Sequence, residues 1–588
     1  MRSCDTKRLV RNFLAVRPVY FALFGLGACL FALATVVTRW TSTESAFVGV
    51  GGFIPVSDAM GYFRCALSAA GSALPSVSGL SADWCGRRIL YPLSLLTLLS
   101  VGGFNPAFVL LIQALIIGAC IGVSMIAVSR AFSKTAGFVV GSLCAVFAYQ
   151  WATANFMTEF LGLSAGLVSA SLLLVHAVER KPAMAVAGVA MLSLALAARA
   201  GALFALPPVC IWCYFTVRPA NQALHFPSLF VITAVALLGP ILQIIGAAQV
   251  GANLGNFGGN FSTSLYDLST GSRNWDEAYQ AFGHLFLTLP EGEVFQIVQA
   301  KALENIGAQP RIFLASLYGA ASLYVGTLFG FVTTGRLNQA LTALLVVGVL
   351  RCLIAWRSPA MSLTLIVFLG ELLAAPFVID GGGHRVFAAT VWCRALLAGV
   401  GASMCVAVLT NVRSIKSSQK RKTSAGSKGA AWALAVVLMA LVITPMTPLA
   451  TLMSPRFVES RHACPTNQIP EIVNFKAESM AIGVANQTKL PLWGTLIVAP
   501  GRFDADDLLR QSSWGHRLGP MPPGSWVGFA FDRQVDFKGR LLPLFWQGVL
   551  PESANGLYAI CVGDADRGKQ LGDFELRRLE SIEAFNGR

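Results

Sequence analysis

Long apolar runs recur between residues 18 and 452 of this 588-residue chain. Many of them approach the roughly 20 residues that a helix needs to cross a bilayer. In lipid, backbone polar groups must be hydrogen-bonded within a helix or a closed barrel, and these runs lack the period-two alternation of barrel strands. They therefore predict a polytopic α-helical membrane protein. The candidate spans lie at about 18–38, 105–131, 136–151, 158–178, 182–198, 200–217, 228–250, 311–333, 338–356, 360–379, 386–411 and 430–452.

The charge of the chain is arranged around these runs. Only 12% of the residues are charged and 55% are hydrophobic, with a formal net charge of +15. From Pro455 onward, 15 basic residues balance 15 acidic ones, so the excess lies among the 29 bases and 14 acids of the first 454 residues. Bases beside apolar runs are what the positive-inside rule predicts. The net charge therefore requires no nucleic-acid partner.

Two basic clusters set the expected orientation. Residues 1–17 carry five bases against Asp5, and "RSIKSSQKRKTSAGSK" holds six bases and no acid within a loop at about 412–429. Both clusters predict cytoplasmic segments, although the second could instead bind lipid headgroups or nucleic acid. No convincing small-residue cleavage site precedes Thr38, which favours an uncleaved first helix over a signal peptide.

This orientation requires an odd number of spans. We expect about eleven, with an apolar helix at 88–103 lying along the surface and one segment between 311 and 356 not crossing; thirteen is the alternative. The expected organisation is a transmembrane domain at 1–453, with outer loops at about 39–87 and 251–310, and an extracytoplasmic domain at 454–588.

The C-terminal domain has a different pattern from the rest of the chain. Its runs "LWGTLIVAP", "SWVGFAFD" and "GLYAICVG" are bounded by Gly, Pro and Asp, which is typical of strands. We expect this domain to be mostly β, with some helix near its end. No internal repeat is visible.

Four of the thirteen cysteines fall in segments expected on the outer side. Cys65 and Cys85 lie in the first outer loop, and Cys464 and Cys561 lie in the C-terminal domain. Each segment thus holds one candidate pair, and disulfides belong to oxidising compartments such as the periplasm. Two coincidental pairs of thiols are the alternative, but agreement with the charge-based orientation favours disulfides.

Few residues could carry chemistry. The sequence contains no Walker loop, no HExxH and no GxSxG motif, which leaves a sparse set of polar residues at span ends on the expected outer face. The set comprises Asp58 in "SDAMGYF", Arg87 and Arg88 in "WCGRRILYP", Thr158 and Glu159 in "NFMTEFLGL", Arg199 in "LAARAGALFALPP", and Asp380, His384 and Arg385 in "FVIDGGGHRVFAAT".

These positions also have structural explanations. Asp58 could be a helix N-cap, and Arg87 and Arg88 could anchor the chain at headgroup depth. Glu159 could be stabilised by a helix dipole, although an acid at the end of a membrane helix is expensive enough to indicate function. The glycines before Arg385 could simply form a tight turn between two spans.

Taken in order, these motifs resemble the GT-C class of membrane glycosyltransferases. The resemblance lies in an acid followed by an aromatic after the first span ("DAMGYF"), in "RRILYPL", in the "TE" that opens a span, in "ARAGALFALP" and in "GGGHR" before a late span. The outer "YDLSTGSRNW" segment followed by helix is similar to bacterial members of the class. The resemblance covers about residues 1–411, and the C-terminal domain lies outside it.

The resemblance implies an enzyme of the bacterial inner membrane that transfers a hexose or pentose from a polyprenyl-phosphate carrier. The acceptor, a glycan, lipid or protein, would be glycosylated on the periplasmic face, usually with inversion. Asp58 would be the general base, since a carboxylate can deprotonate an incoming hydroxyl. The chain has one acid there and no DxD motif, so no metal is indicated. A lone carboxylate could hold a divalent cation only with Glu159 or another distant ligand.

Cations would then stabilise the departing phosphate, where negative charge develops. Arginine suits this role because it binds phosphate bidentately and stays charged. Arg385, Arg199 and one of Arg87 or Arg88 would bind the phosphate, and His384 would support them or protonate the phosphate. Glu159 would orient a sugar hydroxyl or an arginine. Tyr62 and Trp84 would stack on the sugar or line the entrance for the isoprenoid chain.

Other functions stay open at this point. A transporter or flippase for lipid-linked saccharides would place charges near the middle of several spans, whereas most ionisable residues here lie at span ends, with Arg199 and Arg351 ambiguous. A polymerase or ligase would share the lipid-linked substrate. A non-catalytic assembly protein would use residues 454–588 for binding.

Overall fold

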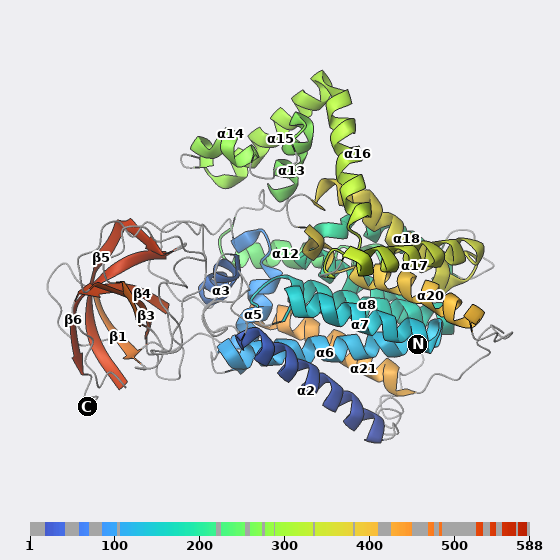
Figure 1. Cartoon of the computed structure of the whole chain (residues 1–588), viewed down its shortest axis with the longest axis horizontal. Helices are drawn as coiled ribbons and strands as arrows, with labels where there is room; N and C mark the ends of the chain where they lie inside the picture. Colours follow the sequence, from blue (N-terminus) through green and yellow to red (C-terminus); the bar gives the residue numbers. More distant parts are fainter. Residues whose placement is uncertain are drawn as a thin grey trace.

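The computed structural model describes most of the chain (Figure 1). The described residues are 18–41, 58–69, 85–102, 106–153, 155–218, 225–252, 259–272, 277–286, 289–332, 335–379, 383–409, 425–449, 469–475, 481–484, 525–532, 541–547, 556–571 and 574–584.

Up to residue 449 the described elements are helices. The α-helices are α2 (Pro18–Thr41), α3 (Asp58–Ala69), α5 (Leu90–Val101), α6 (Pro106–Ala131), α7 (Lys134–Trp151), α8 (Glu159–Glu179), α9 (Pro182–Ala198), α10 (Leu206–Val217), α11 (Phe226–Ala236), α12 (Leu238–Gln249), α13 (Gly259–Thr270), α14 (Glu277–Phe286), α15 (Glu291–Ala308), α16 (Pro310–Gly326), α17 (Gly335–Ile354), α18 (Pro359–Ala374), α20 (Val391–Leu409) and α21 (Ala425–Ile443). Short 3₁₀ helices are η2 (Ala200–Ala205), η4 (Ala375–Phe377), η5 (Gly383–Phe387) and η6 (Thr444–Met446).

Eight helical stretches among the described residues are long and apolar enough to cross a membrane. They cover 108–131, 159–179, 200–217, 226–249, 335–354, 359–377, 391–409 and 429–446, and shorter apolar helices cover 26–36, 90–101 and 182–198. The outer surface of the bundle is apolar as well, since Phe226, Phe230, Ile241 and Ile244 are exposed on α11 and α12. Such a surface suits hydrocarbon rather than water. The chain is thus an α-helical membrane protein, as the apolar runs predict.

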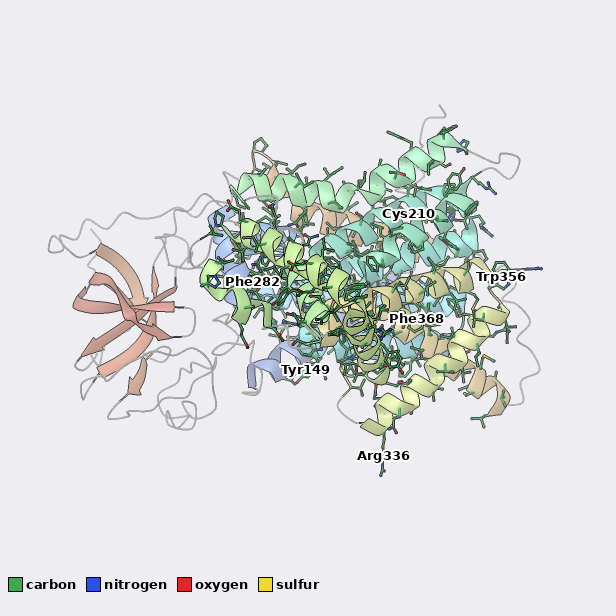
Figure 2. All side chains as sticks on the ribbon, turned by 90° about the horizontal axis from the view of Figure 1, so that it is seen from above. Tyr149, Cys210, Phe282, Arg336, Trp356 and Phe368 are labelled. Atoms are coloured by element: carbon green, nitrogen blue, oxygen red, sulfur yellow. A yellow bond between two sulfur atoms is a disulfide. The ribbon has the colours of Figure 1, made fainter. Side chains whose placement is uncertain are left out.

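Helix α8 forms the centre of the bundle. Its residues from Glu159 to Ala177 are buried, and it packs against α6, α9 and α21. Gly166 permits a close approach, because a Cβ there would collide with the backbone of Ala389 just before α20. Phe368 of α18 is also buried within the bundle, whereas Figure 2 shows Arg336 projecting away from the helices. With a rise of 1.5 Å per residue, the ends of α8 are about 30 Å apart.

The C-terminal end of α8 lies on the same side of the bundle as the start of α21. There the His176 ring contacts the Lys181 carbonyl at 2.9 Å and the Thr216 hydroxyl at 3.0 Å. The indole of Trp432, early in α21, contacts the sulfur of Met184 at 3.1 Å. The basic loop expected at 412–429 ends earlier, because residues 425–429 already belong to α21, and residues 412–424 lie outside the described residues. Helix α21 therefore begins at the end of the bundle opposite Glu159.

Helices α13 to α15 form a separate group that Figure 1 draws above the bundle helices, with α16 leading back to them. Helix α16 packs on η4 and α13, and Thr327 directly after it contacts His384 at 2.9 Å. The apolar run at 311–333 was expected as a candidate span. Helix α16 ends at Gly326 and, like α7 at the candidate span 136–151, is not among the eight stretches long and apolar enough to cross.

The C-terminal region contributes one described sheet. Its strands are β1 (Ile469–Phe475), β2 (Ala481–Val484), β3 (Ser525–Asp532), β4 (Leu541–Gln547), β5 (Gly556–Leu571) and β6 (Phe574–Ala584), in the order β1-β5-β6-β4-β3-β2. β1 also pairs with β3, and the β4–β6 pair is parallel whereas the others are antiparallel.

Two of the expected strands coincide with the described sheet. "SWVGFAFD" is β3 and "GLYAICVG" lies in β5, whereas "LWGTLIVAP" lies outside the described residues. The helix expected near the end of the chain is replaced by β6. This segment is extended because it pairs antiparallel with β5 from Phe574 to Ala584. Cross-strand pairing thus overrides the local sequence pattern there.

Candidate functional site

Polar side chains from five separate segments meet at the N-terminal end of α8. All of them are residues that the sequence singles out. They are Asp58 and Tyr62 of α3, Arg88 just before α5, Glu159 at the first position of α8, Arg199 at the end of α9, and Arg385 of η5. We refer to these six residues as the arginine–carboxylate cluster.

Glu159 is the buried centre of the cluster. Its Oε1 lies 3.0 Å from Nη2 of Arg199, and the two side chains are only 1% and 3% exposed. The same oxygen lies 4.0 Å from Nε of Arg385, and the Thr158 hydroxyl donates to Oε2 at 3.3 Å. One carboxylate thus orients two guanidinium groups.

Asp58 is the accessible carboxylate of the cluster. It opens α3, its side chain is 42% exposed, and its Oδ2 lies 3.9 Å from Nη2 of Arg385. Tyr62, one helical turn later, lies on the same face of α3 and accepts a hydrogen bond at 3.1 Å from Nη1 of Arg88. The structure therefore presents a carboxylate, a phenol and two guanidinium groups side by side.

Arg88 remains charged in this setting. Burial alone would lower the pKa of its guanidinium, but the nearby Tyr62, Asp58 and Glu159 more than offset that effect and raise the pKa. Within the described part of the cluster, three guanidinium groups face two carboxylates. Its formal charge is therefore positive, which favours an anionic ligand.

Local backbone features explain how the sequence brings these groups together. Cys65 of α3 is disulfide-bonded to Cys85, with 5.4 Å between their Cα atoms, so the helix that carries Asp58 is tied to the segment that carries Arg88. This confirms the first predicted disulfide. The Gln243 amide then donates to the carbonyl of Gly86 at 2.5 Å and fixes the same segment to α12.

Arg199 reaches Glu159 because α9 stops there. The backbone of Arg199 is extended, with φ −145° and ψ 94°, and the chain continues in the 3₁₀ helix η2 rather than in another α-helical turn. On the facing helix, Gly162 lies one turn after Glu159, and a Cβ at that position would come within 3.0 Å of the Arg199 Cβ. A glycine at 162 therefore leaves room for the arginine.

Two expected site residues point elsewhere. The guanidinium of Arg87 forms an ion pair with Glu291 at the start of α15 and lies 4.7 Å from the ring centroid of Phe295. The ring of His384 contacts the Thr327 hydroxyl and the Arg394 guanidinium, at 2.9 Å and 3.1 Å. Of the two adjacent arginines, Arg88 is the one in the cluster.

Some expected residues cannot be placed. Trp84, Asp380 and Cys464 lie outside the described residues, and Cys561 is described only as part of the backbone of β5. The second expected disulfide is therefore outside the described part of the chain. Within the described ranges, no group of three or more His, Cys, Asp or Glu side chains is placed to hold a metal ion.

Sequence reasoning missed a second group of ionisable residues beside the cluster. Glu371 of α18 and Arg394 of α20 form an ion pair, 2.7 Å between Oε1 and Nε, and both side chains are fully buried. Each is the single charge in an apolar run, "FLGELLAAP" and "VWCRALL". An ionisable residue inside a membrane span is expensive, and that signal alone could have singled out both residues.

The fold and the cluster together define an α-helical membrane protein with an arginine-rich polar site at one end of its bundle. No protein-family model matches the sequence, and no curated protein matches it.

Among solved structures the chain is similar to oligosaccharyltransferases of Archaeoglobus fulgidus. One, in complex with Zn and sulfate, aligns with a TM-score of 0.35 and 12% sequence identity over 73% of this chain and 53% of that chain. AglB in complex with an inhibitory peptide and a dolichol-phosphate aligns with a TM-score of 0.37 and 12% identity over 74% of this chain and 56% of that chain. A third, tethered to an acceptor peptide with the NVT sequon, aligns with a TM-score of 0.38 and 13% identity over 74% of this chain and 55% of that chain. The chain spans about half the length of these proteins.

Proposed function

We propose that this chain is a membrane glycosyltransferase of the GT-C class that moves a sugar from a polyprenyl-phosphate carrier to an acceptor, with inversion. The observation that carries the proposal is the geometry of Asp58. This half-exposed carboxylate lies 3.9 Å from the Arg385 guanidinium and at the edge of a cluster with two further arginines. A base and an anion site are thus adjacent, as displacement of a lipid phosphate from an anomeric carbon requires.

In this mechanism Asp58 accepts the proton of the acceptor hydroxyl as the hydroxyl attacks the anomeric carbon. The bond from that carbon to the carrier phosphate breaks on the opposite face, so the configuration inverts. Arg385 and Arg88 hold the departing phosphate, where negative charge develops. Bidentate contacts from guanidinium groups would fix its orientation.

Burial divides the roles of the other members. Arg199 and Glu159 are almost fully buried and paired with each other, so they orient the cluster rather than contact the sugar. Glu159 holds Arg385 on one side while Asp58 faces it on the other. Tyr62, bonded to Arg88, is placed to contact the sugar or the phosphate. The mechanism needs no metal ion, although Asp58 could contribute one ligand to a divalent cation.

We also propose that the cluster faces the periplasm of a bacterial inner membrane. The support is topological: α8 begins at Glu159, and α21 begins at the opposite end, within the basic segment at 412–429. Cytoplasmic placement of that loop puts Glu159 on the outer side. The Cys65–Cys85 disulfide beside the cluster is consistent with an oxidising compartment.

The same argument supports eleven crossings. The crossing helices would be α2, α6, α7, α8, α9, η2–α10, α11–α12, α17, α18, α20 and α21. Helix α5 would stay at the outer face, since its Thr97 hydroxyl donates to the carbonyl of Leu441 near the end of α21, at 2.7 Å. Helix α7 is counted because the chain must return to the outer side between α6 and α8, whereas α16 would not cross. The chain would then divide into a membrane domain at 1–453 and a mostly-β extracytoplasmic domain at 454–588.

A flippase or transporter of lipid-linked saccharides is the second candidate function. The Glu371–Arg394 pair favours it, because buried charges within membrane helices often mark transport pathways. Besides joining α18 to α20, the pair contacts Tyr324 of α16 and His384 of the η5 turn, next to Arg385 of the cluster, which agrees better with a supporting role for the proposed transferase site.

The deciding experiment is sugar transfer from a polyprenyl-phosphate donor in membranes that contain Asp58→Asn. Transfer should fall roughly 10²–10⁴-fold, the usual contribution of a general base. Glu304→Gln is a matched control, because Glu304 is an exposed carboxylate that pairs with Lys301 across one helical turn, away from the cluster. Normal transfer by well-expressed Asp58→Asn would remove Asp58 as the base. Donor translocation without transfer would instead support the flippase.

A further inference from the structure

The Glu371–Arg394 pair lies at the centre of a buried polar network next to the proposed site. Both side chains are inaccessible to solvent. Removing two charges from water costs several kcal/mol per ion, and their attraction commonly does no more than offset that cost. A pair of this kind therefore calls for an explanation other than stability.

The network joins the end of α16 and the residues just after it to α18, the η5 turn and α20, which lie close together in the sequence. The Tyr324 hydroxyl, near the end of α16, donates to Oε1 of Glu371 at 2.6 Å. Nη1 of Arg394 donates to the carbonyl of Leu328 at 2.5 Å and contacts Nδ1 of His384 at 3.1 Å. The end of α16, the end of α18 and the η5 turn are thus fastened to one ion pair.

The direction of these hydrogen bonds can be assigned from chemistry. A guanidinium only donates, so Nδ1 of His384 must accept from Arg394, and the ring proton must be on Nε2. Nε2 then donates to the Thr327 hydroxyl at 2.9 Å, which itself donates to the carbonyl of Leu323 at 2.6 Å. Burial, reinforced by Arg394, lowers the pKa of His384 to about 3, which keeps the ring neutral and able to accept.

Arg394 is further held by aromatic rings. Its guanidinium carbon lies 5.4 Å from the ring centroid of Phe387, 5.7 Å from that of Tyr324 and 5.9 Å from that of Phe331. Aromatic faces attract a cation at these distances. Phe387 ends η5, so the turn is held to Arg394 through its ring as well as through His384.

This anchoring matters because Arg385 is the next residue after His384. The η5 turn is short and opens at Gly383 in a left-handed conformation, φ 58°. From it the two side chains reach different groups: His384 contacts Arg394, whereas Arg385 lies 3.9 Å from Asp58 and 4.0 Å from Glu159.

We propose that Glu371, Arg394 and His384 are positioning residues, which hold η5 so that Arg385 stays within reach of Asp58 and Glu159. The inference rests on the proposed function for its catalytic meaning. The anchoring of η5 can be tested whether or not the chain transfers sugar.

Two variants at His384 distinguish the effect of its hydrogen bonds from the effect of the space that its ring fills. Gln offers an oxygen that can accept from Arg394 and a nitrogen that can donate to Thr327, so His384→Gln should retain most activity. His384→Leu fills the space without either bond. We expect its kcat/KM for the polyprenyl-phosphate donor to fall roughly tenfold or more, mainly through a higher KM if Arg385 binds phosphate.

Thr327→Val is the milder variant in case His384→Leu fails to fold. It removes one acceptor without burying a charge and should cost roughly three- to tenfold in kcat/KM, the value of one hydrogen bond. Thr216→Val is its matched control. Thr216 also contacts a histidine ring, at the opposite end of α8, where its hydroxyl lies 3.0 Å from Nε2 of His176. Because Nδ1 of His176 donates to the Lys181 carbonyl, Nε2 accepts from Thr216, and removing this hydroxyl far from the cluster should leave transfer unchanged.

Hydrogen exchange gives a readout that does not depend on transfer. The amides of Ala388 and Thr390 donate to the carbonyls of Arg385 and Phe387, at 3.2 Å and 2.9 Å. In purified full-length protein these amides should exchange about tenfold faster in His384→Leu and Thr327→Val, and at the wild-type rate in His384→Gln and Thr216→Val.

The outcomes distinguish the two proposals. An inactive wild type would overturn the proposed transferase, while faster exchange restricted to the two disrupting variants would still support the anchoring. Unchanged exchange in both disrupting variants would overturn the anchoring. Faster exchange with an unchanged donor KM and kcat would overturn the claim that the network positions Arg385 for catalysis.

Discussion

Arg199 and Glu159 form an almost fully buried ion pair between two neighbouring helices, with 3.0 Å between Nη2 and Oε1. Glu159 opens α8 and Arg199 follows the last residue of α9, so the pair links a helix start to a helix end. The same Glu159 oxygen lies 4.0 Å from Arg385. The pair thus couples the packing of α8 and α9 to the guanidinium that faces Asp58.

Replacing one member of this pair should be more harmful to stability than replacing both. Arg199→Leu leaves a buried carboxylate without its main counter-charge, and the free energy of unfolding should fall by roughly 3–5 kcal/mol. The double variant Arg199→Met with Glu159→Leu removes both charges and should recover most of that loss, yet remain inactive in transfer. Thermal unfolding in detergent and the transfer assay measure the two effects. A double variant as active as wild type would contradict the proposed role of Glu159.

Most of the arginine–carboxylate cluster could be predicted from the sequence, because charge is so rare in the apolar part of the chain. Asp58, Glu159, Arg199 and Arg385 each stand at the end of an apolar run. The basic loop at 412–429 predicts that these ends share one face of the membrane. Because these helix ends lie on one face of the membrane, the four side chains can lie close together in space.

The contacts that these side chains make could not be predicted from the sequence, because they depend on the three-dimensional arrangement of the helices. Glu371 and Arg394 each have a visible signal as lone charges, but their pairing depends on how α18 packs beside α20. Arg87 and Arg88 are identical neighbours, and the backbone just before α5 decides which of them meets Tyr62. His384 lies beside Arg385 in sequence, yet its ring contacts a different group. Residue type and spacing carry no information on these directions.

The two adjacent arginines should behave differently when replaced. Arg88→Gln removes a cation of the cluster and should lower kcat/KM for the lipid donor roughly 10²-fold. Arg88→Lys should restore only part of it, because lysine cannot bind phosphate bidentately. Arg87→Gln should chiefly loosen α15, since Arg87 pairs with Glu291 there. Its effect on stability should be non-additive with that of Glu291→Gln. Equal loss of transfer in Arg87→Gln and Arg88→Gln would contradict this division.

The Cys65–Cys85 disulfide should be required for the placement of Asp58. It closes a segment with a sequence separation of 20, for which chain-entropy estimates give about 3 kcal/mol. Cys65→Ser with Cys85→Ser should lower both thermal stability and transfer. A thiol reductant should lower the activity of the wild type more than that of the double variant, which has no Cys65–Cys85 bond to lose. Cys210→Ser with Cys213→Ser is the matched control, because neither thiol is disulfide-bonded. Full activity of reduced wild-type protein would show that α3 is held without the bond.

His384 should make the protein sensitive to acid. Its pKa is about 3 in the folded protein because of burial and the nearby Arg394, against an ordinary value of 6.5. Between these two values the unfolded chain binds a proton that the folded protein does not. The contribution of His384 to the free energy of unfolding is therefore fully present above about pH 6.5. It is lost as the pH falls toward 3, by at most about 1.4 kcal/mol per pH unit.

His384→Gln keeps the hydrogen bonds but cannot titrate, so it should lose less stability than wild type between pH 8 and pH 5. Thermal unfolding of both proteins across this range measures the difference. Above pH 7 the ring is neutral in the folded and unfolded states alike, and His384→Gln should then have no effect on pH dependence. Identical losses of stability in wild type and His384→Gln on acidification would show that His384 takes up its proton in the folded protein, against the tautomer that Arg394 imposes.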